Sequence, residues 1–344
     1  MLSSFGWLYG KIAGIRNALF DRGILRSHSL GARTISIGNI TAGGTGKTPL
    51  VALVAEISAK NGETVCILTR GYGRKNPKSR VLVSDGRNVL VDAATGGDEP
   101  VELARKLIGK AMIVADADRV SAAKWALDEF GVTVFVLDDG FQHRRAKRDL
   151  DIVCVDATNP FGNEKILPAG ILREPLQNLR RADVIVLTRA NLAENIENLR
   201  SEISNSCSGV PMFTAENRIS NVVKLEDFFA GILKPQSLDP PAALAFCALG
   251  NPGNFFEQLR LDGFDIRAEK AFRDHHFYSH EDINALQTAA KNLKAVLLTT
   301  AKDAVKLKGL EFNVPCFVVE IENVVTDQKE FGELKAFCDL ITSS

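Results

Sequence analysis

The sequence predicts an α/β fold in which a parallel sheet is covered by helices and a second, smaller α/β domain follows. From residue 33 onward, short apolar runs rich in β-branched residues alternate with segments of helical periodicity. This order is typical of parallel strands joined by crossover helices, because strands covered on both faces are apolar along their whole length. Apolar residues are 45% of the 344 residues and charged residues 24%. These values are ordinary for a globular chain and exclude a disordered one.

The first series of elements runs to about residue 187. Continuous apolar runs predict strands at 34–37, 64–69, 112–115, 132–137, 151–155 and 183–187. Helical patterns and their end signals predict helices at 48–60, 99–108 and 119–130. The segment 80–91 has two valine-rich arms around Asp85-Gly86 and predicts a β-hairpin.

A weakly patterned stretch, 201–241, separates this series from a second one. The second series predicts strands at 243–248, 295–299 and 316–319 and helices at 255–261 and 283–294. We therefore predict two domains, 34–220 and 221–344, after an N-terminal segment, 1–33, in line with roughly 150 residues per domain. The last helix, 328–341, could pack on either domain.

Charge and cysteine usage exclude several classes of protein. Basic and acidic residues number 42 each, which argues against a protein that binds nucleic acid over its whole surface. No uncharged apolar run reaches the roughly 18 residues that a membrane-spanning helix needs. The six cysteines are scattered without a C-x-x-C pair, which predicts reduced, buried thiols in a cytosolic protein.

A glycine-rich loop joins the strand at 34–37 to the helix at 48–60. Its residues are Thr41, Ala42, Gly43, Gly44, Thr45, Gly46, Lys47 and Thr48. In such a phosphate-binding loop (P-loop), backbone N–H groups hold phosphate at a helix N-terminus. Lys47 can reach the β- and γ-phosphates, and the Thr48 hydroxyl can ligate Mg²⁺. Thr41 replaces the first glycine of the strict pattern, and a glycine-rich turn with a surface lysine is the alternative.

The nucleotide is predicted to be ATP. A guanine-specific N-K-x-D motif is not met, because Lys302 and Asp303 are adjacent in the nearest candidate. Partition-type ATPases carry a lysine before the glycine pair, where this chain has Ala42. With the loop, the first domain is predicted to be P-loop NTPase-like.

The strand at 132–137 ends in two aspartates, Asp138 and Asp139. A carboxylate at a strand end beside a P-loop can position Mg²⁺. Aspartates of an ordinary surface loop are the alternative. In another loop, Asp98 is a competent N-cap, which accounts for it as well as a functional role does. Arg173 could stabilise charge on a transferred phosphoryl group, or form an ion pair with Glu174.

Basic residues gather in three loops, which can favour an anionic substrate. The alternative for most of these residues is an ordinary solvated charge in a surface loop. The three groups are Arg70, Arg74, Lys75 and Lys78; Arg144, Arg145, Lys147 and Arg148; and Arg173, Arg180 and Arg181.

Motifs along most of the chain, from about residue 5 to 307, resemble those of the tetraacyldisaccharide 4'-kinase (lipid A 4'-kinase) family. The motif 138–143 is the most specific of them, and Arg273 and Ala301 depart from residues common in the family. The motifs are Gly38-Asn39, the loop 43–49, Arg70-Gly71-Tyr72, Gly97-Asp98-Glu99-Pro100, Asp138-Asp139-Gly140-Phe141-Gln142-His143, Leu172-Arg173-Glu174-Pro175, Gly250-Asn251-Pro252, Asp274-His275-His276 and Lys302-Asp303.

The resemblance implies transfer of the γ-phosphoryl of ATP, with Mg²⁺, to the 4'-hydroxyl of a tetraacylated glucosamine disaccharide 1-phosphate. The product would be lipid IVA of lipid A synthesis, made at the cytosolic face of the inner membrane of a Gram-negative bacterium. The site would lie in a cleft between the two domains. Asp98 and His275 would pair across it, with Asp98 as the base and His275 orienting it.

The residues singled out therefore fall into four groups. The expected catalytic residues are Asp98, His275, Lys47 and Arg173, and the nucleotide-binding residues are those of the loop 41–48. The expected Mg²⁺ ligands are Thr48, Asp138, Asp139 and, through water, Glu174. The expected acceptor-binding residues are Arg70, Tyr72, Arg74, Glu99, Gln142 and His143.

The N-terminal segment, 1–33, is predicted to bind a membrane surface as an amphipathic helix. Apolar residues recur at spacings of three and four, which places them on one helical face. Five basic residues and one acidic residue give this segment a charge of +4, which suits anionic headgroups. An ordinary helix docked on the core is the alternative. The apolar residues are Phe5, Leu8, Ile12, Ile15 and Leu19, flanked by Trp7 and Tyr9.

Two other functions compete with that of a lipid kinase. A nucleotide-dependent switch or metallochaperone would need a dimer face and usually Cys/His metal ligands, and no cysteine lies near the five histidines in sequence. The other competitor is a kinase of small metabolites. The N-terminal segment and the basic loops fit an anionic lipid substrate better than a small metabolite. No nucleic-acid or protein partner is implied.

Overall fold

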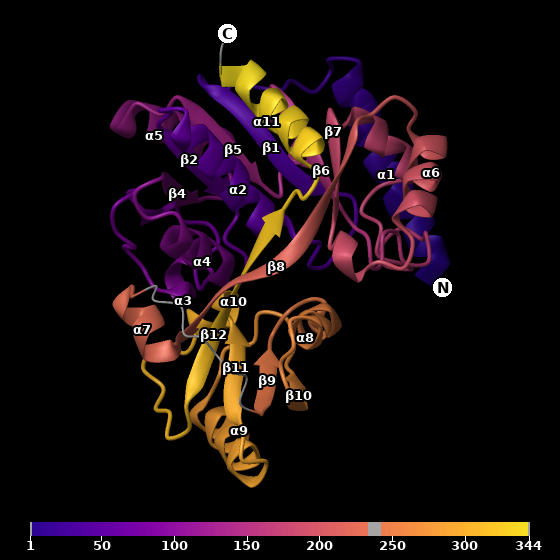
Figure 1. Ribbon diagram of the computed structural model, residues 1–344. Coiled ribbons are helices and arrows are strands. Elements are labelled where there is room, and N and C mark those ends of the chain that lie inside the picture. Colours follow the sequence, from indigo (N-terminus) through magenta and orange to yellow (C-terminus); the bar gives the residue numbers. More distant parts are fainter. Residues whose placement is uncertain (1, 233–241, 343–344) are drawn as a thin grey trace.

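The computed structural model describes residues 2–232 and 242–342, and within them one twelve-stranded sheet organises the fold (Figure 1). The strand order is β10-β9-β11-β12-β8-β7-β6-β1-β5-β2-β4-β3. Neighbouring strands are parallel except for the pairs β8–β12 and β3–β4, which are antiparallel. The predicted α/β class with a helix-covered parallel sheet is confirmed.

We call residues 33–215 the P-loop region and residues 216–324 the C-terminal region. The strands of the P-loop region are β1 (Arg33–Asn39), β2 (Val65–Thr69), β3 (Val81–Ser84), β4 (Ala111–Ala115), β5 (Val134–Asp138), β6 (Leu150–Asp156) and β7 (Val184–Thr188). Its helices are α2 (Lys47–Lys60), α3 (Ala93–Gly96), α4 (Asp98–Lys106), α5 (Arg119–Phe130) and α6 (Ile196–Ser206), with 3₁₀ turns η1 (Leu176–Arg181) and η2 (Ala190–Leu192). Helix α1 (Leu2–Asp21) precedes it.

The C-terminal region continues the same sheet. Its strands are β9 (Ala243–Cys247), β10 (Ile266–Ala271), β11 (Val296–Thr300), β12 (Cys316–Val324) and the second part of β8 (Met212–Lys224). Its helices are α7 (Leu225–Ala230), α8 (Pro252–Leu261), α9 (His280–Asn292) and α10 (Ala301–Ala304), and α11 (Gln328–Thr342) follows.

The alternation of side chains along each strand supplies two cores. On β2, Val65 and Ile67 pack on one face of the sheet with residues of α2, α4 and α11, whereas Cys66 and Leu68 pack on the other face with residues of α5. Helices on both faces bury every residue of β2 and β5. This burial explains why these strands read as continuous apolar runs.

Strand β8 crosses the predicted boundary at residue 220. Its first residues pair with β7, up to Ala215, and residues from Glu216 to Lys224 pair with β12. Figure 1 shows β8 and β12 running between the two regions. The chain therefore passes between regions within a strand, about five residues earlier than predicted. Helix α11 returns to the P-loop region, where it contacts α2, β1 and β6.

The predicted hairpin at 80–91 forms only in part. Its first arm is β3, which pairs with β4. The second arm makes only an isolated bridge, between Ser84 and Val89. The buried thiols are confirmed, since all six cysteines are free and buried. In the described part of the chain, no helix has the length and apolar character to cross a membrane.

Candidate active site

A cleft of about 700 Å³ lies where the two regions meet, and both contribute residues to it. The P-loop, the end of β5 and the start of α4 supply one side, and the loops after β9, β10 and β11 supply the other. The two sides are close: a Cβ added at Gly250 would lie 3.0 Å from the Gly44 amide nitrogen.

The P-loop follows β1 and ends where α2 begins. Gly46 adopts a left-handed conformation, φ +73°, and Lys47 opens the helix. Residues 42–48 all line the cleft, as predicted. Lys47 Nζ lies 3.5 Å from Asp139 Oδ1, and the buried hydroxyl of Thr45 has no hydrogen-bond partner. A phosphate chain could be bound here by the backbone amides at the N-terminus of α2, the Lys47 charge and the unpaired Thr45 hydroxyl.

The first residue of the predicted loop is a correction. Thr41 is buried and bridges to Leu172, so it does not line the cleft. The neighbouring amide of Ala42 already donates to the Ile171 carbonyl, 2.7 Å away. Backbone hydrogen bonds to residues 171–173 thus fix the start of the loop. The amides that are free to bind a phosphate begin after Ala42.

The two aspartates after β5 lie beside the P-loop because β5 is the neighbour of β1 in the sheet. Asp138 is buried and accepts a hydrogen bond from Thr69 Oγ1 at 2.8 Å. Burial, with the charges of Glu99 and Asp139, raises the pKa of Asp138 to about 6. Asp139 has a left-handed backbone, φ +54°. Burial opposes its ionisation, but Lys47 and Arg173 lower the pKa of Asp139.

Arg173 points into the cleft, as predicted. Its Nη1 donates to both carboxylate oxygens of Asp139 at 2.8 Å and to Gln142 Oε1 at 3.2 Å. Two cations, those of Lys47 and Arg173, therefore flank one carboxylate at the phosphate end of the cleft. The alternative ion pair between Arg173 and Glu174 does not form.

Glu174, predicted as a metal ligand, points away from the cleft. Its Oε2 accepts hydrogen bonds from Asn17 at 2.6 Å, Asn178 at 2.7 Å and Arg181 at 2.8 Å. These three hydrogen bonds hold the buried carboxylate away from the cleft. The Glu174 side chain, which follows Arg173 in the sequence, points to the opposite side of the chain. Glu174 instead ties α1 to η1.

Arg74, predicted to bind the acceptor, is also a correction. Its guanidinium is buried and donates to the carbonyls of Ala115 and Pro77 at 3.0 and 2.9 Å, so it holds its own loop in place. Arg70 and Tyr72 do line the cleft. Arg70 Nη1 donates to the Tyr72 hydroxyl at 3.2 Å, and its guanidinium lies over the Tyr72 ring.

Gln142 and His143, which were predicted to bind the acceptor, line the cleft where α1 meets the P-loop region. Gln142 is fixed by its Nε2, which donates to the Asn39 carbonyl at 3.0 Å. Burial and the nearby charges of Arg119 and Arg148 lower the pKa of His143 to about 4. His143 is therefore neutral near pH 7, and its Nε2 is buried without a hydrogen-bond partner.

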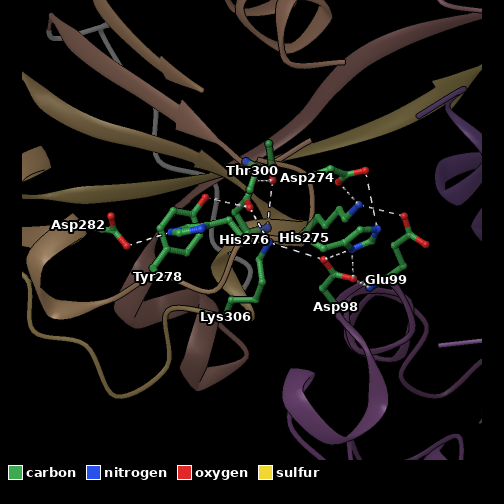
Figure 2. A network of polar contacts seen from close by, with 12 residues as sticks. Asp98, Glu99, Asp274, His275, His276, Tyr278, Asp282, Thr300 and Lys306 are labelled. Atoms are coloured by element: carbon green, nitrogen blue, oxygen red, sulfur yellow. Dashed lines mark hydrogen bonds and ion pairs between the residues drawn. The ribbon is translucent and has the colours of Figure 1, made fainter. Parts of the chain in front are cut away.

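Asp98 and His275, 177 residues apart, are in contact. His275 Nδ1 lies 2.9 Å from Asp98 Oδ2 and 3.1 Å from Oδ1 (Figure 2). Burial opposes ionisation of Asp98, but His275 and the cations of Lys302 and Lys306 lower the pKa of Asp98 to about 2. The hydrogen bond that His275 donates to Asp98 raises the pKa of His275. The predicted pairing is formed in the structure.

The two members of the pair lie at different depths in the cleft. His275 lines the cleft, with a left-handed backbone at φ +60°. Asp98 is 3% exposed and lies behind it. In this arrangement the imidazole faces the cleft and the carboxylate contacts it from the buried side.

Lys302, for which no site role was predicted, links the two regions beside this pair. Lys302 Nζ lies 3.0 Å from Glu99 Oε1 and 3.3 Å from Asp274 Oδ1. Burial opposes its charge, yet Glu99, Asp98 and Asp274 raise the pKa of Lys302 above its usual range. Glu99 is thus bound by a lysine from the other side of the cleft.

Three other residues line the cleft and were not predicted to do so from the sequence. Arg189 binds the Gly44 carbonyl at 2.7 Å and pairs with Asp156, and so holds the P-loop from behind. Arg119 also lines the cleft, and burial lowers its pKa. Glu102 lines it one turn after Asp98, and burial raises its pKa to about 8. An isolated Arg or Glu within a helix could not be distinguished from surface charge.

Helix α1 packs with its small residues inward. A Cβ added at Gly6 would lie 2.7 Å from the Ile166 carbonyl oxygen, and one at Gly10 2.7 Å from Ile166 Cδ1. Asn17, on the same side, is buried against Glu174. The large apolar side chains point to solvent: Trp7 is 66% exposed, Leu8 50%, Ile12 58% and Ile15 62%. Leu19 is half-buried, and the side chain of Phe5 lies outside the described part.

Comparisons with known proteins agree on one family. A family model described as "Tetraacyldisaccharide-1-P 4'-kinase" matches residues 1–336. A tetraacyldisaccharide 4'-kinase of Syntrophus aciditrophicus is 35% identical over 97% of this chain and 91% of its own. One of Geobacter metallireducens is 40% identical over 87% of this chain and 86% of its own. The crystal structure of "apo" form LpxK from Aquifex aeolicus in complex with ATP matches with a TM-score of 0.77 and 33% identity, over 98% of this chain and 97% of that one.

Proposed function

The chain belongs to the tetraacyldisaccharide-1-P 4'-kinase family, and from this premise we propose how its residues perform the reaction. The enzyme transfers the γ-phosphoryl group of ATP to the 4'-hydroxyl of a tetraacylated glucosamine disaccharide 1-phosphate, giving lipid IVA in lipid A biosynthesis. The observation that carries the proposal is one cleft that holds a P-loop on one side and the Asp98–His275 pair on the other.

The activity itself is tested with radiolabelled ATP and lipid A disaccharide 1-phosphate as acceptor. We expect label in the lipid product, and none when the 4'-hydroxyl of the acceptor is blocked. ATP hydrolysis without labelled lipid would favour a nucleotide-dependent switch instead, and labelling of a small polyol would favour a metabolite kinase.

At the phosphate end, Lys47 and Arg173 stabilise the charge that develops on the transferred group. Both are held in place before the reaction by Asp139, with which they pair at 3.5 and 2.8 Å. Preorganised charges of this kind lose little energy to reorganisation when the transition state forms. Residues 43–48 hold the phosphate chain through the amides at the start of α2.

The residues at the phosphate end also fit Mg²⁺. Thr48, Asp138 and Asp139 line the same cleft with oxygen donors, which is the donor type that Mg²⁺ prefers. The described residues contain no cluster of three or more His, Cys, Asp or Glu able to hold a metal ion. A metal held by few protein ligands, with water and phosphate completing its shell, is characteristic of Mg²⁺ in kinases. When bound, the ion neutralises charge on the β- and γ-phosphates.

Activity is expected to require the metal and both aspartates. Asp138→Asn and Asp139→Asn should each lower kcat by about a hundredfold or more, because each removes a carboxylate from the phosphate end. Asp128→Asn, at an exposed position of α5, is the matched control. The measurement is kcat against Mg²⁺ concentration for the three variants. Full activity in excess EDTA would show that these carboxylates hold no metal.

Acceptor binding is proposed for the residues of the cleft that face α1. Arg70, Tyr72, Gln142 and His143 line it together with Tyr9 and Arg16 of α1. A sugar needs flat and hydrogen-bonding surfaces, which the Arg70–Tyr72 stack and the Gln142 amide supply. The acyl chains would then leave the cleft along α1, towards its exposed apolar side chains.

We propose that α1 lies in the membrane surface. The helix turns Gly6 and Gly10 towards the rest of the protein and exposes Trp7, Leu8, Ile12 and Ile15, which is the reverse of a helix that docks on a core. At its end a pocket of about 380 Å³ has no acidic residue in its lining, which suits lipid phosphate. A peripheral enzyme that uses ATP would work at the cytosolic face of the inner membrane. The pocket is lined by Arg16, Phe20, Leu25, Arg26, His28 and Arg145.

The membrane role predicts a loss of liposome binding without a loss of fold. In the variant Leu8→Ser/Ile12→Ser/Ile15→Ser we expect flotation with anionic liposomes to fall at least tenfold, because three exposed apolar contacts are lost. The matched control, Leu90→Ser/Ile108→Ser/Leu261→Ser, removes three equally exposed apolar side chains elsewhere and should float like the wild type. Equal flotation of the first variant and the wild type would make α1 a structural helix only.

A further inference from the structure

A buried lysine that the proposed mechanism does not use lies behind the Asp98–His275 pair. The Lys306 side chain is 0% exposed, and its Nζ lies 3.6 Å from Asp98 Oδ2 and 2.9 Å from Asp303 Oδ1. Asp98 belongs to the P-loop region and Asp303 to α10 of the C-terminal region. The ammonium group therefore stands between two carboxylates, one from each side of the cleft.

The Asp303 end of this network is fixed by three neutral donors. Asp303 Oδ1 accepts from the Tyr278 hydroxyl at 3.0 Å, and Oδ2 accepts from Thr300 Oγ1 at 2.7 Å and from the Ala248 amide at 3.0 Å. These donors come from three separate segments of the C-terminal region, so Asp303 cannot follow a movement of Lys306. Tyr278 also places its ring under the ammonium group, 5.6 Å from the ring centroid. The lysine is thus held at a defined point.

At the other end the position of Asp98 is defined by its donors. The Glu99 amide donates to Oδ1 at 2.9 Å, and His275 Nδ1 lies 2.9 Å from Oδ2, the oxygen nearest Lys306 (Figure 2). A third group, Lys302, contributes a positive charge from the side of Glu99 and Asp274. The cluster thus holds two buried carboxylates, Asp98 and Asp303, and two that are more exposed, Glu99 and Asp274, against two lysines and one histidine.

We propose that Lys306 is a positioning residue of the kinase reaction, which holds the Asp98 carboxylate ionised and turned towards His275 when the two regions meet. The inference rests on the proposed role of the Asp98–His275 pair. Without the ammonium group, the carboxylates of Asp98 and Asp303 would share a buried space with no cation between them. Like charges in such a space favour protonation of one of them, and a protonated pair cannot accept the proton of the sugar hydroxyl.

The sign of the pH effect follows from this charge. The pair must be deprotonated to act as a base, so kcat/KM rises with pH through its apparent pKa. A neighbouring cation disfavours binding of a proton by either member of the pair. Removing that cation therefore moves the acidic limb of the profile to higher pH. The charged groups that face Lys306 are Asp98 and Asp303, with His275 and Lys302 acting on it through Asp98.

The test is the pH profile of Lys306→Met with the full-length chain, ATP and lipid A disaccharide 1-phosphate. We expect the acidic limb to move up by about one pH unit or more and kcat at neutral pH to fall at least tenfold, with KM for ATP little changed. Lys308→Met, an exposed lysine two residues along the chain, is the matched control and should keep the wild-type profile. In an Asp98→Ala background, Lys306→Met should change the residual rate less than twofold.

Lys306→Met could fail to fold because it leaves Asp303 without its cation. Lys306→Met/Asp303→Asn removes both charges. The amide oxygen at position 303 can still accept from Thr300 and Ala248, and the amide NH2 can donate to the Tyr278 hydroxyl, so this variant should fold, as thermal unfolding would show. The shift of the acidic limb should persist in this double variant but be smaller, because Asp98 still lacks the cation at 3.6 Å while the Asp303 charge no longer repels it. A folded variant of either kind with the wild-type limb and kcat would overturn the proposal. A wild-type chain without lipid phosphorylation would instead overturn the proposed function, so the two failures are distinct.

Discussion

Replacing Lys47 with alanine is expected to lower kcat by a factor of about a hundred to a thousand. The Lys47 ammonium group faces the cleft from the first residue of α2 and contacts Asp139 at 3.5 Å. The attraction between this charge and the transferred phosphoryl group grows as the transition state forms, so its loss appears in kcat more than in binding. The measurement is the rate of lipid phosphorylation at saturating ATP.

The fold should survive this change. Arg173 still pairs with Asp139, so no buried carboxylate is left without a cation. Lys60→Ala, at the exposed last turn of the same helix, is the matched control and should retain the wild-type kcat. Near-normal turnover of Lys47→Ala would contradict the assignment of the loop as the phosphate site.

The sequence predicted the strands that are buried on both faces and missed two that are not, β8 and β10. β2 and β5 are almost wholly apolar because helices cover both sides. Strand β8 is thirteen residues long, but exposed and buried positions alternate along much of it, with Glu216 and Arg218 at the crossing between regions. Its burial depends on β7 and β12, which lie before and after it in the chain, so its own pattern was too weak to predict a strand.

The candidate site could be predicted where a motif lies on one continuous segment. The P-loop and the aspartates after β5 are such cases, because the end of one strand fixes their position. Glu174 and Arg74 were wrong for a related reason: they neighbour cleft residues in sequence, but the backbone turns their side chains to α1 and to their own loop. Lys306 and Arg189 act only through contacts between distant segments. No pattern within one segment could indicate them.

The pair formed by Asp98 and His275 should carry the other large effect. Asp98→Ala and His275→Ala are each expected to lower kcat by a factor of about a hundred to ten thousand, the range for a lost general base. KM for ATP should change little, because the P-loop and Arg173 remain. An alcohol is a weak nucleophile, so its proton must be accepted by a nearby base. The pair formed by Asp98 Oδ2 and His275 Nδ1, 2.9 Å apart, can accept it. The measurement is kcat and KM for both substrates.

The size of the single losses separates two ways in which the pair could work. His275 lines the cleft and Asp98 is buried behind it, so a proton accepted by the imidazole is stabilised by the carboxylate. If the two residues act as one unit, the single losses should be similar. If Asp98 alone were the base, His275→Ala would keep a much larger share of the rate than Asp98→Ala. His280→Ala, at an exposed position at the start of α9, serves as the control.

The double variant tests whether the residues share a single step. Residues that act as a unit show losses far from additive, because removing either one already abolishes what both provide. We therefore expect Asp98→Ala/His275→Ala to be no more than about threefold slower than the slower single variant. Its pH profile should lack the acidic limb, because the coupled titration that produces this limb belongs to the pair. Multiplicative losses, or a limb that persists in the double variant, would show that another group accepts the proton and that Asp98 only begins α4.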